Sequence, residues 1–160
     1  MEGIFLLLGS NLGNRAAVLN KAIEALKIHK IQLVNKSSVY ETAAWGKTDQ
    51  QAFLNQVVEV KTDYNPAELL SVILDIELEL GRVRKVKWGE RLIDIDILYF
   101  NDQVIKEDEL EIPHPGIPSR RFTLIPLVEI CPQFIHPIKQ VNQKELLNNC
   151  KDNLKVSIYK

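Results

Sequence analysis

The chain has 160 residues, with 20 Lys and Arg against 21 Asp and Glu, and a formal net charge of −1. This balance argues against a general nucleic-acid or membrane-surface protein. The length predicts one domain over residues 1–160, large enough to fold without disulfides. Cys131 and Cys150 lack metal-ligand spacing, and no signal-peptide pattern opens the sequence. We therefore expect a reducing, cytoplasmic location.

The first half of the chain alternates strand and helix patterns. Residues 4–8 form an apolar run typical of a buried strand. A glycine-containing turn then leads to a helix that Asn14 caps and that extends to Ile28. The turn has neither common phosphate-loop spacing, so an ordinary turn and helix cap is the favoured interpretation. Further strands are predicted over 31–40 and 53–62, on either side of an exposed polar loop over 42–51.

The second half contains the best-marked helix of the sequence. Asn65 can cap it, Pro66 occupies its first position, Glu68 completes a capping box and Gly81 ends it. Glu77 lies beside the apolar stripe, and spacing alone favours a surface position for it. A strand over 93–100, a short return strand at 104–105, an extended proline-rich segment over 112–118 and short helices ending near 130 and 150 follow.

This order of elements predicts an α+β fold, the ferredoxin-like βαββαβ sandwich. Such a fold has an antiparallel sheet with helices on one face, and we expect the active site on the other, loop-covered face. The loop over 42–51, Asn55 and the acidic residues of the strand over 93–100 should meet there. Because this fold hosts many functions, the residues of the site must identify the activity.

Residues 82–97 carry the strongest chemical signal. Residues 82–91 hold five basic side chains and one acid, a net charge of +4. Asp94 and Asp96 follow in an apolar strand, where alternation places them on one face, about 7 Å apart at the backbone. Two carboxylates and the phosphates of a substrate suit Mg²⁺, and the bases suit phosphate oxygens. The alternative is a solvated basic loop before an edge strand; the juxtaposition favours a phosphate and metal site.

Two other polar residues stand in unusual positions. Asn55 lies in an apolar strand, where a buried amide needs several hydrogen bonds, although a bond to a nearby loop would also explain it. His114 is flanked by prolines and followed by Arg120 and Arg121. A single histidine is usually a surface or hydrogen-bonded residue, so His114 is a candidate only in this context.

These motifs resemble the family of 6-hydroxymethyl-7,8-dihydropterin pyrophosphokinases, enzymes of the folate pathway. The resemblance covers nearly the whole chain. It is most specific over 87–98, where the sequence KWGERLIDIDIL fits the family signature. GSNLG at 9–13, ET, WG and DQ within 41–50, FLN at 53–55, GRVR at 81–84, PHP at 113–115, RRF at 120–122 and PL at 126–127 also resemble family segments.

The resemblance implies transfer of the β,γ-pyrophosphoryl group of ATP to the hydroxymethyl oxygen of the dihydropterin, releasing AMP. Asp94 and Asp96 would hold two Mg²⁺, and Arg82 and Arg91 would act with them as catalytic residues. The implied ATP-binding residues are Glu77, Arg84, Trp88, Arg91, Ile97, His114 and Arg120. The implied pterin-binding residues are Thr42, Ala43, Trp45, Phe53, Asn55, Asp94 and Phe122, with the two phenylalanines stacking on the flat heterocycle.

Some positions depart from the family pattern. Ala44 stands where a proline is common, which predicts a less rigid second loop before binding. Gly116, Pro118 and Ser119 replace bulkier or charged residues. Glu109 and Glu111 stand where some members place a base or hydroxyl near ATP. The third loop is one residue shorter than in some members, and this affects the reach of Trp88.

Two other classes of protein compete with this assignment. A nucleotidyl transferase or cyclase would share the Asp-x-Asp metal chemistry, but it gives no reason for Phe53, Asn55 and Phe122 to surround a heterocycle. A ferredoxin-like RNA-binding module would need exposed strand aromatics and a basic face. We expect small-molecule substrates, neither nucleic-acid nor membrane partners, a monomer, and a possible association with neighbouring folate-pathway enzymes.

Overall fold

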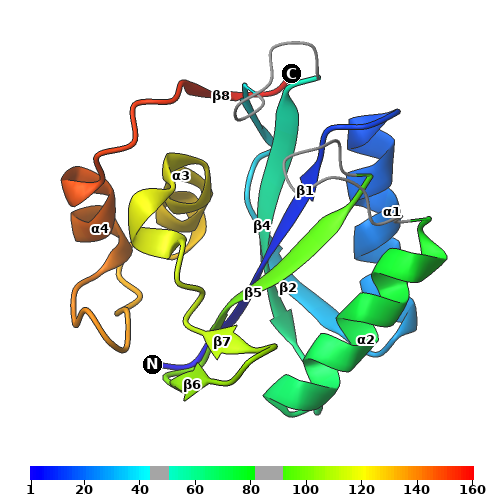
Figure 1. The fold of residues 1–160 in the computed structure, drawn as a ribbon, viewed down its shortest axis with the longest axis horizontal. Coiled ribbons are helices and arrows are strands. Elements are labelled where there is room, and N and C mark those ends of the chain that lie inside the picture. Colours follow the sequence, from blue (N-terminus) through cyan, green and yellow to red (C-terminus); the bar gives the residue numbers. More distant parts are fainter. Residues whose placement is uncertain (44–50, 82–91) are drawn as a thin grey trace.

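The computed structural model describes residues 1–43, 51–81 and 92–160. Its main sheet has the order β5-β1-β4-β3-β8, with β2 also paired to β4 (Figure 1). The strands and helices are β1 (Ile4–Ser10), α1 (Arg15–Ile28), β2 (Gln32–Lys36), β3 (Tyr40–Thr42), β4 (Phe53–Lys61), α2 (Pro66–Glu79), β5 (Asp94–Phe100), β6 (Ile105–Lys106), β7 (Glu111–Ile112), α3 (Arg121–Ile130), α4 (Gln143–Asn149) and β8 (Val156–Ile158). The described strand pairs of both sheets are antiparallel.

Helices α1 and α2 cover one face of the sheet and confirm the predicted ferredoxin-like fold class (Figure 1). Both helices begin where their caps predict. The Asn14 side chain accepts a hydrogen bond from Ala17 N, and Asn65 and Glu68 form the reciprocal capping box. Apolar side chains from alternate strand positions fill the space beneath these helices; among them are Leu6, Leu8, Leu54, Val58, Ile95 and Ile97.

Helices α3 and α4 cover part of the opposite face, a position that the sequence did not indicate (Figure 1). Leu124 and Leu127 of α3 pack there with Leu7, Val57 and Tyr99 of the strands. In Figure 1 both helices lie on the side of the sheet away from α1 and α2. Among the described residues, no helix has the length and apolarity required to cross a bilayer.

Three local predictions differ from the structure. The strand expected over 31–40 is divided into β2 and β3, because a side chain replaces the backbone at one position of the hydrogen-bond ladder. Val57 N donates to the Ser37 hydroxyl at 3.0 Å instead of to a backbone carbonyl. The proline-rich segment is not extended throughout, since Ile117–Ser119 form one 3₁₀ turn with Pro118 in its first positions. The C-terminal tail adds β8 beside β3.

Candidate active site

Strand register places the predicted polar residues on one face of the sheet. Asn55 of β4 is opposite Gly9 of β1, and Gly9 is opposite Asp94 of β5. Directly opposed residues project to the same face, so Asn55 and Asp94 occupy one row across three strands. Asp96 lies two residues further along the same face, opposite Leu7. The prediction that Asn55 and the two aspartates share a face is confirmed.

Gly9 gives the Asn55 side chain room to lie over β1. A Cβ atom at residue 9 would be only 2.7 Å from Asn55 Nδ2. Asn55 is 5% exposed, and its Nδ2 donates to the Leu8 carbonyl at 3.4 Å. The glycine is therefore explained by a side chain on the neighbouring strand, and the amide lies close to the middle of the row.

The end of the β3–β4 pair lies beside this row. Thr42 is opposite Phe53, and Ala43 follows directly after β3. Thr42 is 3% exposed, and its hydroxyl has no hydrogen-bond partner among the described parts of the chain. A buried hydroxyl without a partner costs free energy unless a ligand or water satisfies it. The structure thus provides a polar group suited to a bound molecule at this end.

The two aspartates differ in burial from the isoleucines that flank them. Ile93, Ile95 and Ile97 are 0%, 5% and 5% exposed, whereas Asp94 and Asp96 are half-buried. The predicted alternation of faces is therefore confirmed. Within the described residues, no three His, Cys, Asp or Glu side chains group closely enough to hold a metal ion by themselves.

Glu77 supports the backbone between these aspartates. Its Oε2 accepts a hydrogen bond from Ile95 N at 2.7 Å, and the residue is 3% exposed. The expectation of a surface position was therefore wrong. Among the strands that the structure describes, β5 pairs only with β1 in the main sheet. A side chain of α2 here accepts a hydrogen bond from a backbone N–H of this edge strand. An ionised carboxylate is a stronger acceptor for such a buried N–H than a neutral oxygen is.

Replacing Glu77 tests this support. We expect Glu77→Ala to lower the free energy of unfolding by about 2–3 kcal/mol, because it leaves a buried N–H without its acceptor. Glu77→Gln keeps an acceptor oxygen and should lose about half as much or less. Urea denaturation of both variants measures the difference. Equal losses in both variants would contradict a role for the Ile95 hydrogen bond.

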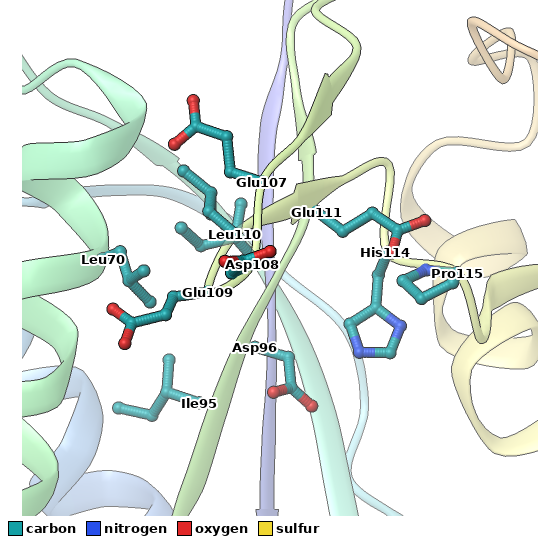
Figure 2. Close-up of a pocket in the computed structure, with 11 residues that line it drawn as sticks. Leu70, Ile95, Asp96, Glu107, Asp108, Glu109, Leu110, Glu111, His114 and Pro115 are labelled. Carbon is teal, nitrogen blue, oxygen red and sulfur yellow. The ribbon is translucent and has the colours of Figure 1, made fainter.

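A pocket of about 270 Å³ opens beside Asp96, and Figure 2 shows its lining. Ile97, His114, Glu109 and Glu111, which the sequence placed near a nucleotide, line it together with Asp96. The Asp96 and His114 side chains face the same space in Figure 2. The sequence did not assign the six other lining residues to a nucleotide site: Leu70, Ile95, Glu107, Asp108, Leu110 and Pro115. Glu107, Asp108 and Leu110 belong to the turn between β6 and β7, which brings acidic side chains next to β5.

His114 is a neutral hydrogen-bond donor in this pocket. Its backbone N–H donates to Leu98 O, and its Nδ1 accepts from Gly116 N, both at 3.0 Å. Burial first, and then the Arg120 guanidinium, lower the pKa of His114 to about 4, against an opposing effect of Glu111. The ring is therefore uncharged near neutral pH. Because Nδ1 accepts, we assign the ring proton to Nε2.

The lowered pKa of His114 predicts a pH dependence of stability. The unfolded chain binds a proton at His114 below about pH 6.5, and the folded chain does so only near pH 4. Unfolding therefore takes up a proton in this interval, and stability falls as pH falls, by at most about 1.4 kcal/mol per pH unit for one group. Denaturation of His114→Gln between pH 4 and 6.5 should show a shallower slope than the wild type; equal slopes would contradict this assignment.

Arg120 packs over the turn that carries His114. A Cβ atom at Gly116 would be 2.8 Å from Arg120 Nε, so the glycine leaves room for the guanidinium. Arg120 Cζ lies 5.8 Å from the centre of the Phe122 ring, at the beginning of α3. Arg120 and Glu77 are not among the residues that line the pocket. Arg120 thus connects the His114 turn with the aromatic residue predicted to contact the pterin.

Several predicted site residues fall outside the described residues. They are Trp45, Arg82, Arg84, Trp88 and Arg91, together with Ala44 of the second loop. The described residues that flank them are the ends of β3 and β4 on one side and of α2 and β5 on the other. Both predicted loops therefore connect elements that carry predicted site residues, Thr42 and Phe53 at the first loop and Glu77 and Asp94 at the second.

The ferredoxin-like fold and the face that carries Asp94 and Asp96 together define a class of protein. It is an enzyme with paired carboxylates beside a pocket. A family model of 7,8-dihydro-6-hydroxymethylpterin-pyrophosphokinase (HPPK) matches residues 5–132. The chain is 46% identical over 145 residues to the Aquifex aeolicus 2-amino-4-hydroxy-6-hydroxymethyldihydropteridine pyrophosphokinase, covering 91% of this chain and 90% of that protein. It is 48% identical over 130 residues to the Bacillus subtilis protein of the same name, covering 81% and 78%.

The chain therefore belongs to the HPPK family, whose named members are pyrophosphokinases. It is a diphosphotransferase of folate biosynthesis. A solved structure of Plasmodium falciparum HPPK-DHPS has the same fold, with a TM-score of 0.75 and 22% identity. That match covers all of this chain, which spans only 48% of the Plasmodium chain.

Proposed function

We propose that the enzyme transfers the β,γ-pyrophosphoryl group of ATP to the hydroxymethyl oxygen of 6-hydroxymethyl-7,8-dihydropterin. The acceptor oxygen forms a bond to the β-phosphorus, the bond from that phosphorus to the α,β-bridging oxygen breaks, and the hydroxyl proton leaves to solvent. The products are AMP and the dihydropterin diphosphate. The row that joins Asn55, Gly9 and Asp94 is the observation that carries this proposal, because it sets an amide and the carboxylates side by side.

The acceptor subsite is assigned to the end of the β3–β4 pair. Asn55 and the unsatisfied Thr42 hydroxyl supply polar groups for the edge of a heterocycle. Phe53 of β4 and Phe122 of α3 supply aromatic faces, and Ala43 and Trp45 complete the predicted set. Buried polar groups of this kind discriminate strongly against a ring that lacks matching hydrogen bonds.

The carboxylates of Asp94 and Asp96 fit Mg²⁺. Both are hard oxygen donors on one face of β5, and two such donors leave coordination positions for water and substrate phosphates. The absence of a third acidic or imidazole ligand among the described residues agrees with a metal that binds together with a nucleotide. When bound, two Mg²⁺ would neutralise phosphate charge and lower the pKa of the acceptor hydroxyl.

The nucleotide subsite is assigned to the pocket beside Asp96. Its lining includes the carboxylates of Glu107, Asp108, Glu109 and Glu111, which accept hydrogen bonds and suit ribose hydroxyls and an exocyclic amine rather than phosphates. Neutral His114 can donate its Nε2–H to a phosphate oxygen without being a cation. Arg82, Arg84, Arg91 and Arg120 would carry the charge complementary to the triphosphate, and Trp88 would help to exclude water.

Product analysis tests the proposal. The enzyme is incubated with ATP, Mg²⁺ and the dihydropterin, and AMP is measured by chromatography. We expect AMP only when the acceptor is present, in a 1:1 ratio with dihydropterin diphosphate. Release of free pyrophosphate without an acceptor product would instead indicate a nucleotidyl transferase or cyclase. RNA binding without turnover of ATP would indicate a ferredoxin-like RNA-binding module.

The remaining properties stay predictions. They are a single domain over 1–160, a monomeric state, a cytoplasmic location and small molecules as the only substrates. The Plasmodium chain named HPPK-DHPS extends well beyond the part that this chain matches. That observation supports the further prediction that neighbouring folate-pathway enzymes associate with this one.

A further inference from the structure

Arg15, the first residue of α1, holds two segments that are distant in sequence. Its Nη1 donates to Glu41 Oε2 at 3.0 Å and to Ala52 O at 2.7 Å. One guanidinium nitrogen carries two hydrogens and can make both bonds at once. Glu41 belongs to β3, and Ala52 immediately precedes β4. Arg15 therefore bridges the two strands at the end where Thr42 pairs with Phe53.

A second side chain, from the connection between β1 and α1, binds the same segment before β4. Asn11 Nδ2 donates to Gln51 O at 3.3 Å, and Asn11 is completely buried. The carbonyls of Gln51 and Ala52 thus both accept hydrogen bonds, one from the connection before α1 and one from the first residue of α1. Arg15 also lies 5.5 Å from the centre of the Tyr159 ring, just after β8. The backbone before β4 is fixed at consecutive residues.

The hydrogen bond to Ala52 O is the important part of this arrangement. The Glu41 side chain is 38% exposed, so the ion pair with Arg15 contributes little by itself. The Arg15 side chain is only 15% exposed, and its bond to the Ala52 carbonyl is charge-assisted. The geometry that it imposes on the backbone before Phe53 is therefore the main effect.

Arg15 lies on the face opposite to the acceptor subsite. Glu41 is opposite Leu54, whose side chain belongs to the core beneath α1 and α2. Thr42 and Phe53 project to the other face, because successive strand residues alternate. Arg15 therefore has no route to the substrate itself and acts through the residues adjacent to Thr42 and Phe53.

We propose that Arg15 is a positioning residue for the acceptor subsite. By joining Glu41 to Ala52 from behind the sheet, it sets the separation and orientation of Thr42 and Phe53. This inference rests on the proposed function, since it names the substrate whose affinity Arg15 controls. Loss of the bridge should loosen the acceptor subsite and leave the pocket beside Asp96, on a different strand, unchanged.

The test compares Arg15→Met with Lys21→Met. Methionine keeps the packing of the arginine stem and removes its donors; Lys21 is an exposed cation on the same helix. We expect Arg15→Met to raise the KM for the dihydropterin on the order of tenfold. The KM for ATP and kcat should change less than about twofold. Arg15→Lys, which restores a cationic donor, should recover most of the acceptor affinity.

Amide hydrogen exchange provides a readout that does not depend on activity. Exchange at residues 52–54 should become faster in Arg15→Met and stay unchanged in Lys21→Met. The proposal is overturned if the acceptor KM of Arg15→Met equals that of Lys21→Met, or if both KM values rise together. Should Arg15→Met fail to fold, a wild-type acceptor KM in Arg15→Gln overturns it. A wild-type enzyme that makes no AMP would refute the proposed function instead.

Discussion

Asp96→Asn is expected to reduce turnover by a factor of about 10³ or more while the protein still folds. Asparagine has nearly the same shape as aspartate but no negative charge, so it is a much weaker ligand for Mg²⁺. Asp96 lies at the pocket with His114, and Asp94 precedes it on the same face of β5. Because the proposed transition state concentrates charge on the phosphates, the effect should fall mainly on kcat.

Folding provides the control for this prediction. Asparagine has nearly the shape of aspartate, so the substitution should leave the packing of β5 intact. The thermal unfolding of Asp96→Asn in the absence of Mg²⁺ should stay cooperative, with a midpoint within about 8 °C of that of the wild type. Asp75→Asn, at an exposed position of α2, makes the same chemical change away from the site and should keep full activity. A turnover above about a tenth of the wild-type rate would contradict the ligand role.

Gly9→Ala is expected to weaken acceptor binding by one to two orders of magnitude without unfolding β1. The new methyl group would stand 2.7 Å from Asn55 Nδ2, well inside contact distance, so the amide must turn away. Asn55 is 5% exposed and has little room to do so without losing its hydrogen bond to the Leu8 carbonyl. The KM for the dihydropterin should rise strongly, whereas the KM for ATP should change little, because the pocket lies on the other side of Asp96.

A double-mutant cycle separates this mechanism from a general distortion of β1. Asn55→Ala should reproduce the loss of acceptor affinity. If Gly9→Ala acts only by displacing the Asn55 amide, the double variant should be no worse than the poorer single variant. Additive losses would show that the methyl group harms the site by another route, and the explanation of Gly9 would then fail.

Residues that act on their own neighbours could be predicted from the sequence. The caps at Asn14 and Asn65 follow from side-chain chemistry within a few residues, and both helices begin there. The period of two in β5 separated the aspartates from the isoleucines for the same reason. The order of elements then sufficed for the fold class, because few topologies satisfy it.

Features that depend on distant pairing could not be predicted in this way. Glu77 was expected at the surface, because nothing in its helix indicates that Ile95 N needs an acceptor. The short strand β8 is visible only through its partner β3, which lies far earlier in the chain. The Arg15 bridge joins residues 26 and 37 positions apart. In the sequence, Arg15 is only a charged residue just after the helix cap Asn14, and this position does not indicate its partners.

Asp94 and Asp96 are expected to bind divalent metal together with the nucleotide. Electron paramagnetic resonance with Mn²⁺ in place of Mg²⁺ tests this binding most directly. The protein is titrated in the presence of dihydropterin and an ATP analogue with a methylene bridge between the α- and β-phosphorus atoms, which cannot react. The wild type should bind two Mn²⁺ that show magnetic coupling, and Asp96→Asn should bind fewer, without coupling. Identical stoichiometry and spectra in both proteins would contradict the assignment of Asp96 as a metal ligand.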